Sequence, residues 1–252
     1  MKKQKRAIFL HHSTGSNIWK GNVSKYSYKL FKEGDVLKWI KKYNKKNKTD
    51  FKVEEKAFPK KQPYGWKNMP FDYYNIWVKN GGNELFMEEP TLEILSKKYE
   101  LIIWKHCYPV SAISKNKDTA DINSEERTVE NYKLQYIALK EKMHEFPETK
   151  FLVWTGATHV KGGTNEESAK RMNEFVNWVR AEWNEKGDNI FLWDFYELET
   201  EGGIYLKDDF AESLSDSHPN KIFSGSIAPY FGQRIVDVLS GLGDEKPITG
   251  KY

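Results

Sequence analysis

Four short, uninterrupted apolar runs constrain the fold of this chain more than any other feature. They cover residues 7–10, 101–104, 151–154 and 190–193. A continuous apolar run of this length is typical of a parallel strand that is buried on both faces of a sheet. Each run opens abruptly into small or polar residues. In an open α/β sheet, these strand ends form the edge where ligands bind.

Stretches with helical spacing of their apolar residues separate the runs, so strands and helices alternate five times. The sequence further predicts a strand over 51–57 and helices from 35, over 72–79, from 90, over 125–146, from 164 and over 222–239. Pro229 is expected to kink or interrupt the last helix. We predict a single α/β domain over residues 1–252, a three-layer α/β/α sandwich with a flavodoxin-like five-stranded parallel sheet.

The composition supports a sizeable core and argues against a dedicated nucleic-acid binder. Hydrophobic residues make up 38% of the chain, with 9 Trp, 14 Tyr and 14 Phe, and each buried aromatic removes roughly 150–250 Å² from water. The net charge of +4, from 40 basic and 36 acidic residues, does not indicate a nucleic-acid partner. Ten lysines between Lys38 and Lys61 are expected to form a solvated face, with contact to an anionic polymer as the alternative.

Cysteine usage and hydropathy exclude further classes of protein. Cys107 is the only cysteine, so there is no internal disulfide and no zinc site built from several cysteines. No apolar run approaches the roughly 18 residues of a membrane span. The four apolar residues after the basic start are too few for the core of a secretion signal. These patterns fit a cytoplasmic protein, or a secreted or periplasmic one whose signal has been removed.

Two polar segments, far apart in the sequence, carry the candidate chemistry. Ser13 follows the first apolar run, where a hydroxyl would stand at the ligand-binding edge of the sheet. Asp216 and His218 lie just before the last predicted helix. A serine nucleophile needs an imidazole to take its proton, and the imidazole needs a group to orient it. The chain order Ser, Asp, His is one of several that converge on this geometry.

In these two segments the chain resembles the SGNH/GDSL-type hydrolases, whose serine follows the first strand and whose Asp and His precede the last helix. The resemblance implies that Ser13 is the nucleophile, His218 the general base and Asp216 its orienting group. It also implies an oxyanion hole made by the Ser13 N–H, a glycine N–H after the second strand, for which Gly65 is the best placed, and a side chain after the third strand, where His106 stands.

The chain departs from the family pattern at three places. The first block reads His11-His12-Ser13-Thr14 instead of Gly-Asp-Ser-Leu, and Lys-His-Cys-Tyr at 105–108 replaces Gly-x-Asn-Asp, so no asparagine is available there. The usual Asp-x-x-His becomes Asp216-Ser217-His218. Either Asp216 reaches the imidazole by a different turn, or a backbone carbonyl orients a Ser–His dyad.

The resemblance implies a serine esterase that removes a small acyl group, with O-acetylated carbohydrate as the first candidate substrate and small lipid or thioester substrates next. No metal or organic cofactor is expected, and the partner is a small-molecule or glycan ester. Position alone suggests that His12 and His159 contact substrate. An acyltransferase would use the same residues. The sequence indicates neither the alcohol nor the oligomeric state.

Two other classes of function stay open. A metal-dependent hydrolase would use the imidazoles and the thiol that map to one sheet edge, namely His11, His12, His106, Cys107, His159 and His218. A non-catalytic carbohydrate-binding protein would use exposed Trp and Tyr rings to stack on sugars.

Overall fold

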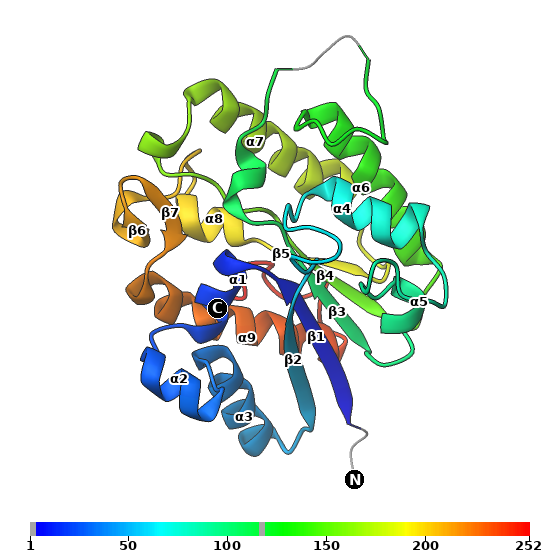
Figure 1. Cartoon of the computed structure of the whole chain (residues 1–252). Coiled ribbons are helices and arrows are strands. Elements are labelled where there is room, and N and C mark those ends of the chain that lie inside the picture. Colours follow the sequence, from blue (N-terminus) through cyan, green and yellow to red (C-terminus); the bar gives the residue numbers. More distant parts are fainter. Residues whose placement is uncertain (1–3, 116–118) are drawn as a thin grey trace.

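A five-stranded parallel sheet forms the middle layer of the molecule, and the computed structural model describes residues 4–115 and 119–252. Its strands stand in the order β2-β1-β3-β4-β5, which is the flavodoxin-like order that the sequence predicts. Figure 1 shows the sheet between two layers of helices. The strands are β1 Lys5–His11, β2 Phe51–Ala57, β3 Leu101–Trp104, β4 Lys150–Trp154 and β5 Ile190–Trp193.

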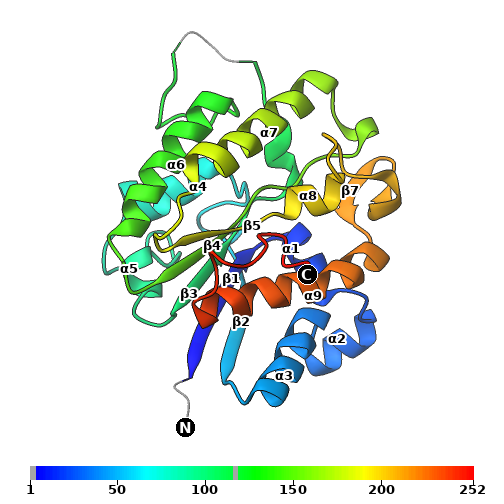
Figure 2. The same cartoon turned by 180° about the vertical axis from the view of Figure 1, so that it is seen from behind.

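Helices cover both faces of the sheet, as Figures 1 and 2 show from opposite sides. On one face α9 packs against α1 and α3, with α2 beside them. This group comprises α1 Ser13–Lys20, α2 Lys25–Phe31, α3 Asp35–Asn47 and α9 Lys221–Ser240. The other face carries α4 Pro70–Tyr73 with a π-helical continuation over Tyr74–Lys79, α5 Leu92–Leu95, α6 Val129–His144, and α7 Glu166–Trp178 with a π-helical end over Val179–Trp183.

The remaining elements are short and lie mostly along the carboxyl edge of the sheet. They are α8 Phe195–Thr200, the two-stranded hairpin of β6 Ala211–Ser213 and β7 Asp216–Pro219, and three 3₁₀ turns over Tyr108–Ser111, Lys161–Gly163 and Asp208–Phe210. Within the described ranges, no helix has the combination of length and hydropathy that a bilayer span requires.

The alternation of side chains along each strand divides the buried residues into two cores. Successive strand residues point to opposite faces, so Ile8 and Leu10 join one core while Ala7 and Phe9 join the other. Both cores are rich in aromatic rings, which accounts for the aromatic content of the sequence. The apolar runs are therefore buried on both sides, as their composition predicts.

Several helices differ in extent or course from the sequence-based prediction, including those predicted over 72–79 and from 90, which begin at Pro70 and Leu92. Helix α9 runs without interruption through Pro229, although proline lacks the N–H that would bond to the preceding turn. Helix α6 begins at Val129 rather than 125, because the Thr128 hydroxyl caps it by accepting the Asn131 N–H at 3.3 Å. Helix α7 is capped by the Asn165 side chain, one residue after the predicted start.

Several elements at and near the carboxyl edge of the sheet were not predicted from the sequence, α8 among them. The polar, aromatic stretch after Ser13 forms helices α1 and α2. The segment that carries Asp216 and His218 is the antiparallel β6–β7 hairpin, with Ala211 paired to Pro219 and Ser213 to Asp216. Because its ladder joins residues on either side of a short turn, the hairpin presents Asp216 and His218 from an extended strand.

Candidate active site

The turn between β1 and α1 places Ser13 as the first helical residue, directly after the end of β1. The backbone of α1 approaches the His11 side chain closely at position 15, which requires glycine there, because a Cβ atom would stand 2.5 Å from the Cβ of His11. Among the described residues, the Ser13 N–H has no hydrogen-bond acceptor, as expected for the first N–H of a helix. Ser13 is exposed, so a ligand can reach its side chain.

The β6–β7 hairpin brings His218 to the same place from the other end of the chain. The Asn17 side chain, on α1, donates to the carbonyl of Pro219 at 3.0 Å and so ties α1 to the end of β7. Asn220 caps α9 by accepting the Phe223 N–H at 2.9 Å, which fixes the point where the strand becomes a helix. These contacts fix the position of the end of β7 relative to α1, although the two segments lie about 200 residues apart in the sequence.

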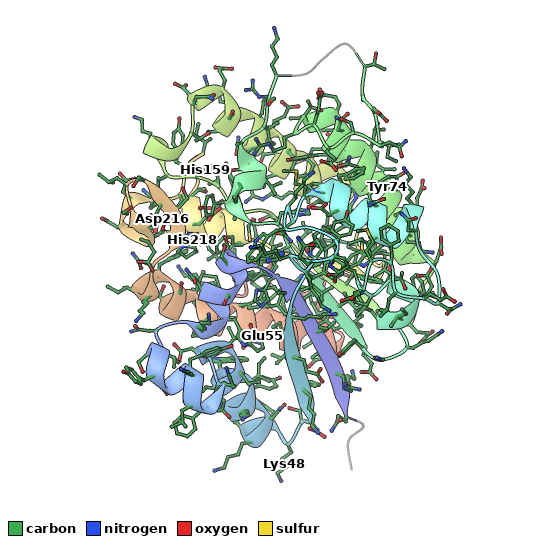
Figure 3. The ribbon with its side chains drawn as sticks, viewed as in Figure 1. Lys48, Glu55, Tyr74, His159, Asp216 and His218 are labelled. Atoms are coloured by element: carbon green, nitrogen blue, oxygen red, sulfur yellow. The ribbon has the colours of Figure 1, made fainter. Side chains whose placement is uncertain are left out.

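Ser13, His218 and Asp216 form a continuous hydrogen-bonded chain. The Ser13 Oγ lies 2.8 Å from Nε2 of His218, and Nδ1 of the same ring lies 2.6 Å from Oδ1 of Asp216. A carboxylate only accepts hydrogen bonds, so Nδ1 carries the proton and Nε2 is free to accept the serine proton. Figure 3 shows Asp216 and His218 side by side at the carboxyl edge of the sheet.

The unusual Asp-x-His spacing follows from the strand conformation of β7. Residues i and i+2 of a strand project to the same side, so Asp216 and His218 face one way while Ser217 is buried on the other. The His218 N–H also donates to Oδ1 of Asp216 at 3.0 Å. Burial raises the pKa of Asp216, but these two hydrogen bonds outweigh it and hold the pKa below its usual range. Asp216 is therefore an anion that faces the imidazole.

Tyr108 was not singled out from the sequence, yet it packs directly against His218. Its ring meets the His218 ring edge-on, with centroids 4.9 Å apart, and meets His159 in the same way at 4.9 Å. Burial raises the pKa of Tyr108, and the nearby Asp216 raises it further. The only sequence signal was its place directly after the third strand. The packing of Tyr108 thus adds to the two hydrogen bonds that restrict the His218 imidazole.

His159 and His12, suggested above as substrate contacts, both lie near this site. His159 is half-buried behind Tyr108, its Nδ1 lies 3.2 Å from Oγ of Ser217, and burial lowers its pKa. His12 is buried beneath the exposed indole of Trp66, with ring centroids 5.2 Å apart. Burial lowers the pKa of His12 to about 4. The exposed indole of Trp66 therefore lies between the His12 ring and solvent.

The structure does not place Gly65 or His106 as oxyanion donors. The Gly65 N–H already donates to the carbonyl of Lys60 at 3.2 Å. The His106 ring points into the core, where it lies 5.1 Å from the Tyr73 ring and 5.5 Å from the Trp104 ring, and only 3% of the residue is exposed. Of the three donors implied by the family resemblance, the geometry retains the Ser13 N–H.

Asn68 is the asparagine that joins the loops after β2 and β3, and sequence reasoning missed it. Its Oδ1 accepts the Cys107 N–H at 2.9 Å. Its Nδ2 donates to the carbonyl of Phe58 at 2.9 Å and to the hydroxyl of Tyr73 at 3.1 Å, so both amide hydrogens are engaged. Asn68 therefore acts as a brace between the loops, with no hydrogen left for an oxyanion.

A buried lysine lies behind the first turn of α1. Lys105 is fully buried, its Nζ donates to the Cys107 sulfur at 3.2 Å, and it lies over the Trp154 ring at 5.4 Å from the centroid. Thr14, in the first turn of α1, lies close to the same sulfur. Burial lowers the pKa of Lys105. The Lys105–Cys107 pair therefore lies between the end of β3 and the start of α1.

We expect His106 to make the protein less stable in acid. Burial lowers its pKa to about 3, so the folded chain resists a proton that the unfolded chain accepts. The contribution of His106 to the free energy of unfolding is fully present above its unfolded pKa of about 6.5, and it falls as the pH decreases from there toward 3. At pH 5 the loss is about 2 kcal/mol. The variant His106→Asn can still donate to the carbonyl of Asn68. Between pH 7.5 and pH 5, its free energy of unfolding should fall by about 2 kcal/mol less than that of the wild type.

Urea unfolding at the two pH values measures this difference. The buried His12 is present in both proteins, so its own contribution cancels in the comparison. Equal acid losses in the variant and the wild type would contradict the assignment of the effect to His106.

The six residues considered for a metal site do not converge. His11 is engaged through Nε2 with Glu55 at 2.9 Å and through Nδ1 with the carbonyl of His12 at 2.8 Å. His106 lies in the core, and the Tyr108 ring separates His159 from His218. Within residues 4–115 and 119–252, no group of three or more His, Cys, Asp or Glu side chains is arranged to hold a metal ion.

Comparisons with known proteins give only distant likenesses. No protein-family model matches the chain, and no curated protein matches it. Among solved structures, a gut microbial diltiazem-metabolizing enzyme matches with a TM-score of 0.47 and 12% identity over 96% of this chain and 47% of its own. A family two carbohydrate esterase from Cellvibrio japonicus matches with a TM-score of 0.47 and 11% identity over 95% of this chain and 62% of its own. The chain thus spans about half to three-fifths of these proteins, and likenesses this distant carry no argument about its activity.

Proposed function

We propose that this chain is a serine esterase of the SGNH/GDSL type that removes a small acyl group through an acyl-enzyme intermediate. The observation that carries the proposal is the hydrogen-bonded chain from Ser13 through His218 to Asp216, with distances of 2.8 and 2.6 Å. Three residues of the types that this chemistry needs are joined in the required order, with the serine open to solvent.

The first half of the reaction forms a covalent ester on Ser13. Its Oγ bonds to the acyl carbon of the substrate while its proton passes to Nε2 of His218. The Ser13 N–H, at the positive end of α1, donates to the carbonyl oxygen as negative charge develops there. The bond from the acyl carbon to the alcohol oxygen then breaks, and His218 returns the proton to the departing alcohol. Asp216 stabilises the imidazolium between these two transfers.

The second half regenerates the enzyme. Water gives a proton to His218 as its oxygen attacks the acyl carbon. The bond from the acyl carbon to the Ser13 Oγ then breaks, and His218 returns the proton to Oγ, which leaves the free acid and the Ser13 hydroxyl. The site is open, because Ser13 is exposed and the Asp216 side chain is 49% exposed. Water therefore reaches the acyl-enzyme readily, which favours hydrolysis over transfer to a second alcohol. We propose an O-acetyl ester on a carbohydrate as the first substrate to test.

Active-site labelling tests the proposal directly. A fluorophosphonate should modify the purified protein once, and peptide mass spectrometry should place the adduct on Ser13. Hydrolysis of p-nitrophenyl acetate should persist in EDTA and stop after labelling, since the proposed reaction uses no metal. Release of acetate from acetylated xylo-oligosaccharides then tests the carbohydrate substrate.

Two outcomes would overturn the proposal. Loss of hydrolysis in EDTA, with activity restored by a divalent metal, would point to a metal-dependent hydrolase. Absence of both labelling and turnover, together with measurable glycan binding, would point to a non-catalytic carbohydrate-binding protein.

A further inference from the structure

A pocket of about 330 Å³ opens beside the proposed catalytic residues, among α1, α2, the end of β7 and the start of α9. These elements lie together at one side of the molecule in Figures 1 and 2. Asn17 and Pro219 line it where α1 meets β7. Asn17 lies four residues after Ser13, or about 6 Å along the helix axis, and Pro219 directly follows His218. A ligand held at Ser13 could therefore reach into this pocket.

The pocket carries a strong excess of positive charge. Its lining includes Lys20, Lys29, Lys32 and Lys221, whereas Glu212 is its only acidic residue. None of the four lysines forms a direct ion pair with a carboxylate among the residues that the structure describes, although the Lys20 charge interacts with Glu55, on β2. We call this feature the lysine pocket. Its charge is unlike that of the whole chain, in which 40 basic residues face 36 acidic ones.

One wall of the lysine pocket is held in place by a tyrosine. The Lys20 ammonium lies over the Tyr28 ring, 5.1 Å from its centroid. The Tyr28 hydroxyl donates to Glu55, on β2. Helix α2 is capped at its start by Ser24, which accepts the Ser27 N–H at 3.1 Å. The pocket is thus built from several elements that are fastened to one another, rather than from lysines scattered on a surface.

We infer that the lysine pocket binds an anionic group, a carboxylate or a phosphate, carried by the ester substrate. Four ammonium groups around one cavity, with a single carboxylate in its lining, create a positive potential that attracts an anion and raises its local concentration. Because the pocket begins one helical turn from Ser13, the anionic group would stand a few bonds from the ester. As a statement about substrate, this inference rests on the proposed esterase function; as a statement about anion binding, it stands by itself.

Equilibrium binding tests the pocket without any catalysis. Isothermal titration of inorganic phosphate and of glutarate, run separately, distinguishes a phosphate site from a carboxylate site. The double variant Lys32→Gln/Lys221→Gln should bind the preferred anion about five- to twentyfold more weakly, because each partly exposed charge pair contributes about two- to fivefold. Glu212→Gln should bind it more tightly, and raising the salt to about 0.5 M should weaken binding in every case.

A lysine far from the pocket serves as the matched control. Lys186 is exposed and lies in the loop before β5, at the opposite edge of the sheet from Ser13. Lys186→Gln removes one positive charge, the same as each of the single variants Lys32→Gln and Lys221→Gln with which it is compared, so it should leave anion affinity at the wild-type value. Equal weakening by Lys186→Gln and the pocket variants, or no binding of either anion, would overturn the inference.

Kinetics with matched esters test the link to substrate choice. In the first pair, the p-nitrophenyl monoester of glutaric acid is compared with its methyl ester, so the charge lies on the acyl side. In the second pair, acetylglycerol phosphate is compared with acetylglycerol, so the charge lies on the alcohol side. We expect kcat/KM to favour the charged member of one pair about tenfold at low salt, and the preference to fall in Lys32→Gln/Lys221→Gln but not in Lys186→Gln. Equal rates within both pairs would overturn the link. Anion binding without any ester hydrolysis would instead retain the pocket and reject the esterase.

Discussion

Ser13→Ala should lower kcat for ester hydrolysis by about 10⁴-fold or more. The Ser13 Oγ is the atom that would bond to the acyl carbon, and it lies 2.8 Å from the Nε2 of His218 that would take its proton. Alanine removes the nucleophile while the helix and its N–H groups stay in place. The measurement is the steady-state rate of p-nitrophenyl acetate hydrolysis, with the urea midpoint showing that the variant is folded.

The same experiment shows whether the catalytic residues act as a unit. His218→Gln should lower kcat about as much as Ser13→Ala does. The double variant should be no slower than either single variant, because removing one of two groups that act in the same step already removes the effect of the other. Ser215→Ala is the matched control. Ser215 occupies the position three before His218, where the family pattern places the acid, but it is exposed and lies next to Ser213 rather than the imidazole. Its variant should keep the wild-type rate, and retained activity in Ser13→Ala would contradict the mechanism.

Arg234→Met should cause a large loss of stability, about 3–5 kcal/mol. Arg234 is 1% exposed, its Nε donates to the carbonyl of Leu192 at 2.7 Å, and a terminal nitrogen donates to the carbonyl of Gly243 at 2.7 Å. These bonds join α9 to β5 and to the segment that follows α9. Methionine fills part of the volume but leaves two buried carbonyls without their charged donor.

Urea unfolding measures the effect, and Arg6→Met is the control. Arg6 pairs with Glu54 at 2.9 Å, but the side chains are 41% and 51% exposed, so water can replace the pair and the unfolding midpoint should hardly move. The unfolding midpoint of Arg234→Lys should fall between those of the wild type and Arg234→Met, because one ammonium group cannot donate to both carbonyls as a guanidinium does. A midpoint for Arg234→Met close to that of Arg6→Met would contradict the proposed role of Arg234.

Features that depend on short-range pattern could be predicted from the sequence. Burial on both faces needs only a short continuous apolar run, so β1, β3, β4 and β5 were recognisable, and their alternation with helices predicted the parallel sheet. The sheet in turn brings the ends of its strands to one edge. For that reason Ser13 could be proposed at the edge without knowledge of any contact.

The exact ends and course of helices were less accessible. A hydroxyl or amide cap decides where a helix begins, and several candidates stood within three residues of each start. Asn165 rather than Thr164 caps α7, and α9 continues through Pro229 because its packing against α1 and α3 outweighs one lost backbone hydrogen bond. Local propensity gives way to tertiary packing in such cases.

The arrangement of the candidate site was decided by the tertiary structure, because hydrogen bonding and side-chain direction depend on partners distant in sequence. Asp216 meets His218 because both project from the same side of strand β7, a strand that no local pattern predicted. Gly65 and His106 suited the oxyanion hole by position in the sequence, but the N–H of one is bonded to Lys60 and the ring of the other points into the core.

The lysine pocket shows the same division between sequence and structure. The composition shows a nearly balanced count of charges and cannot tell where they gather. Only the arrangement of α1, α2 and the start of α9 in the folded chain brings Lys20, Lys32 and Lys221 around one cavity beside Ser13. Coulomb interactions depend on distance in space, so the sequence determined the strands and the candidate serine, while the surroundings of that serine followed from the folded chain alone.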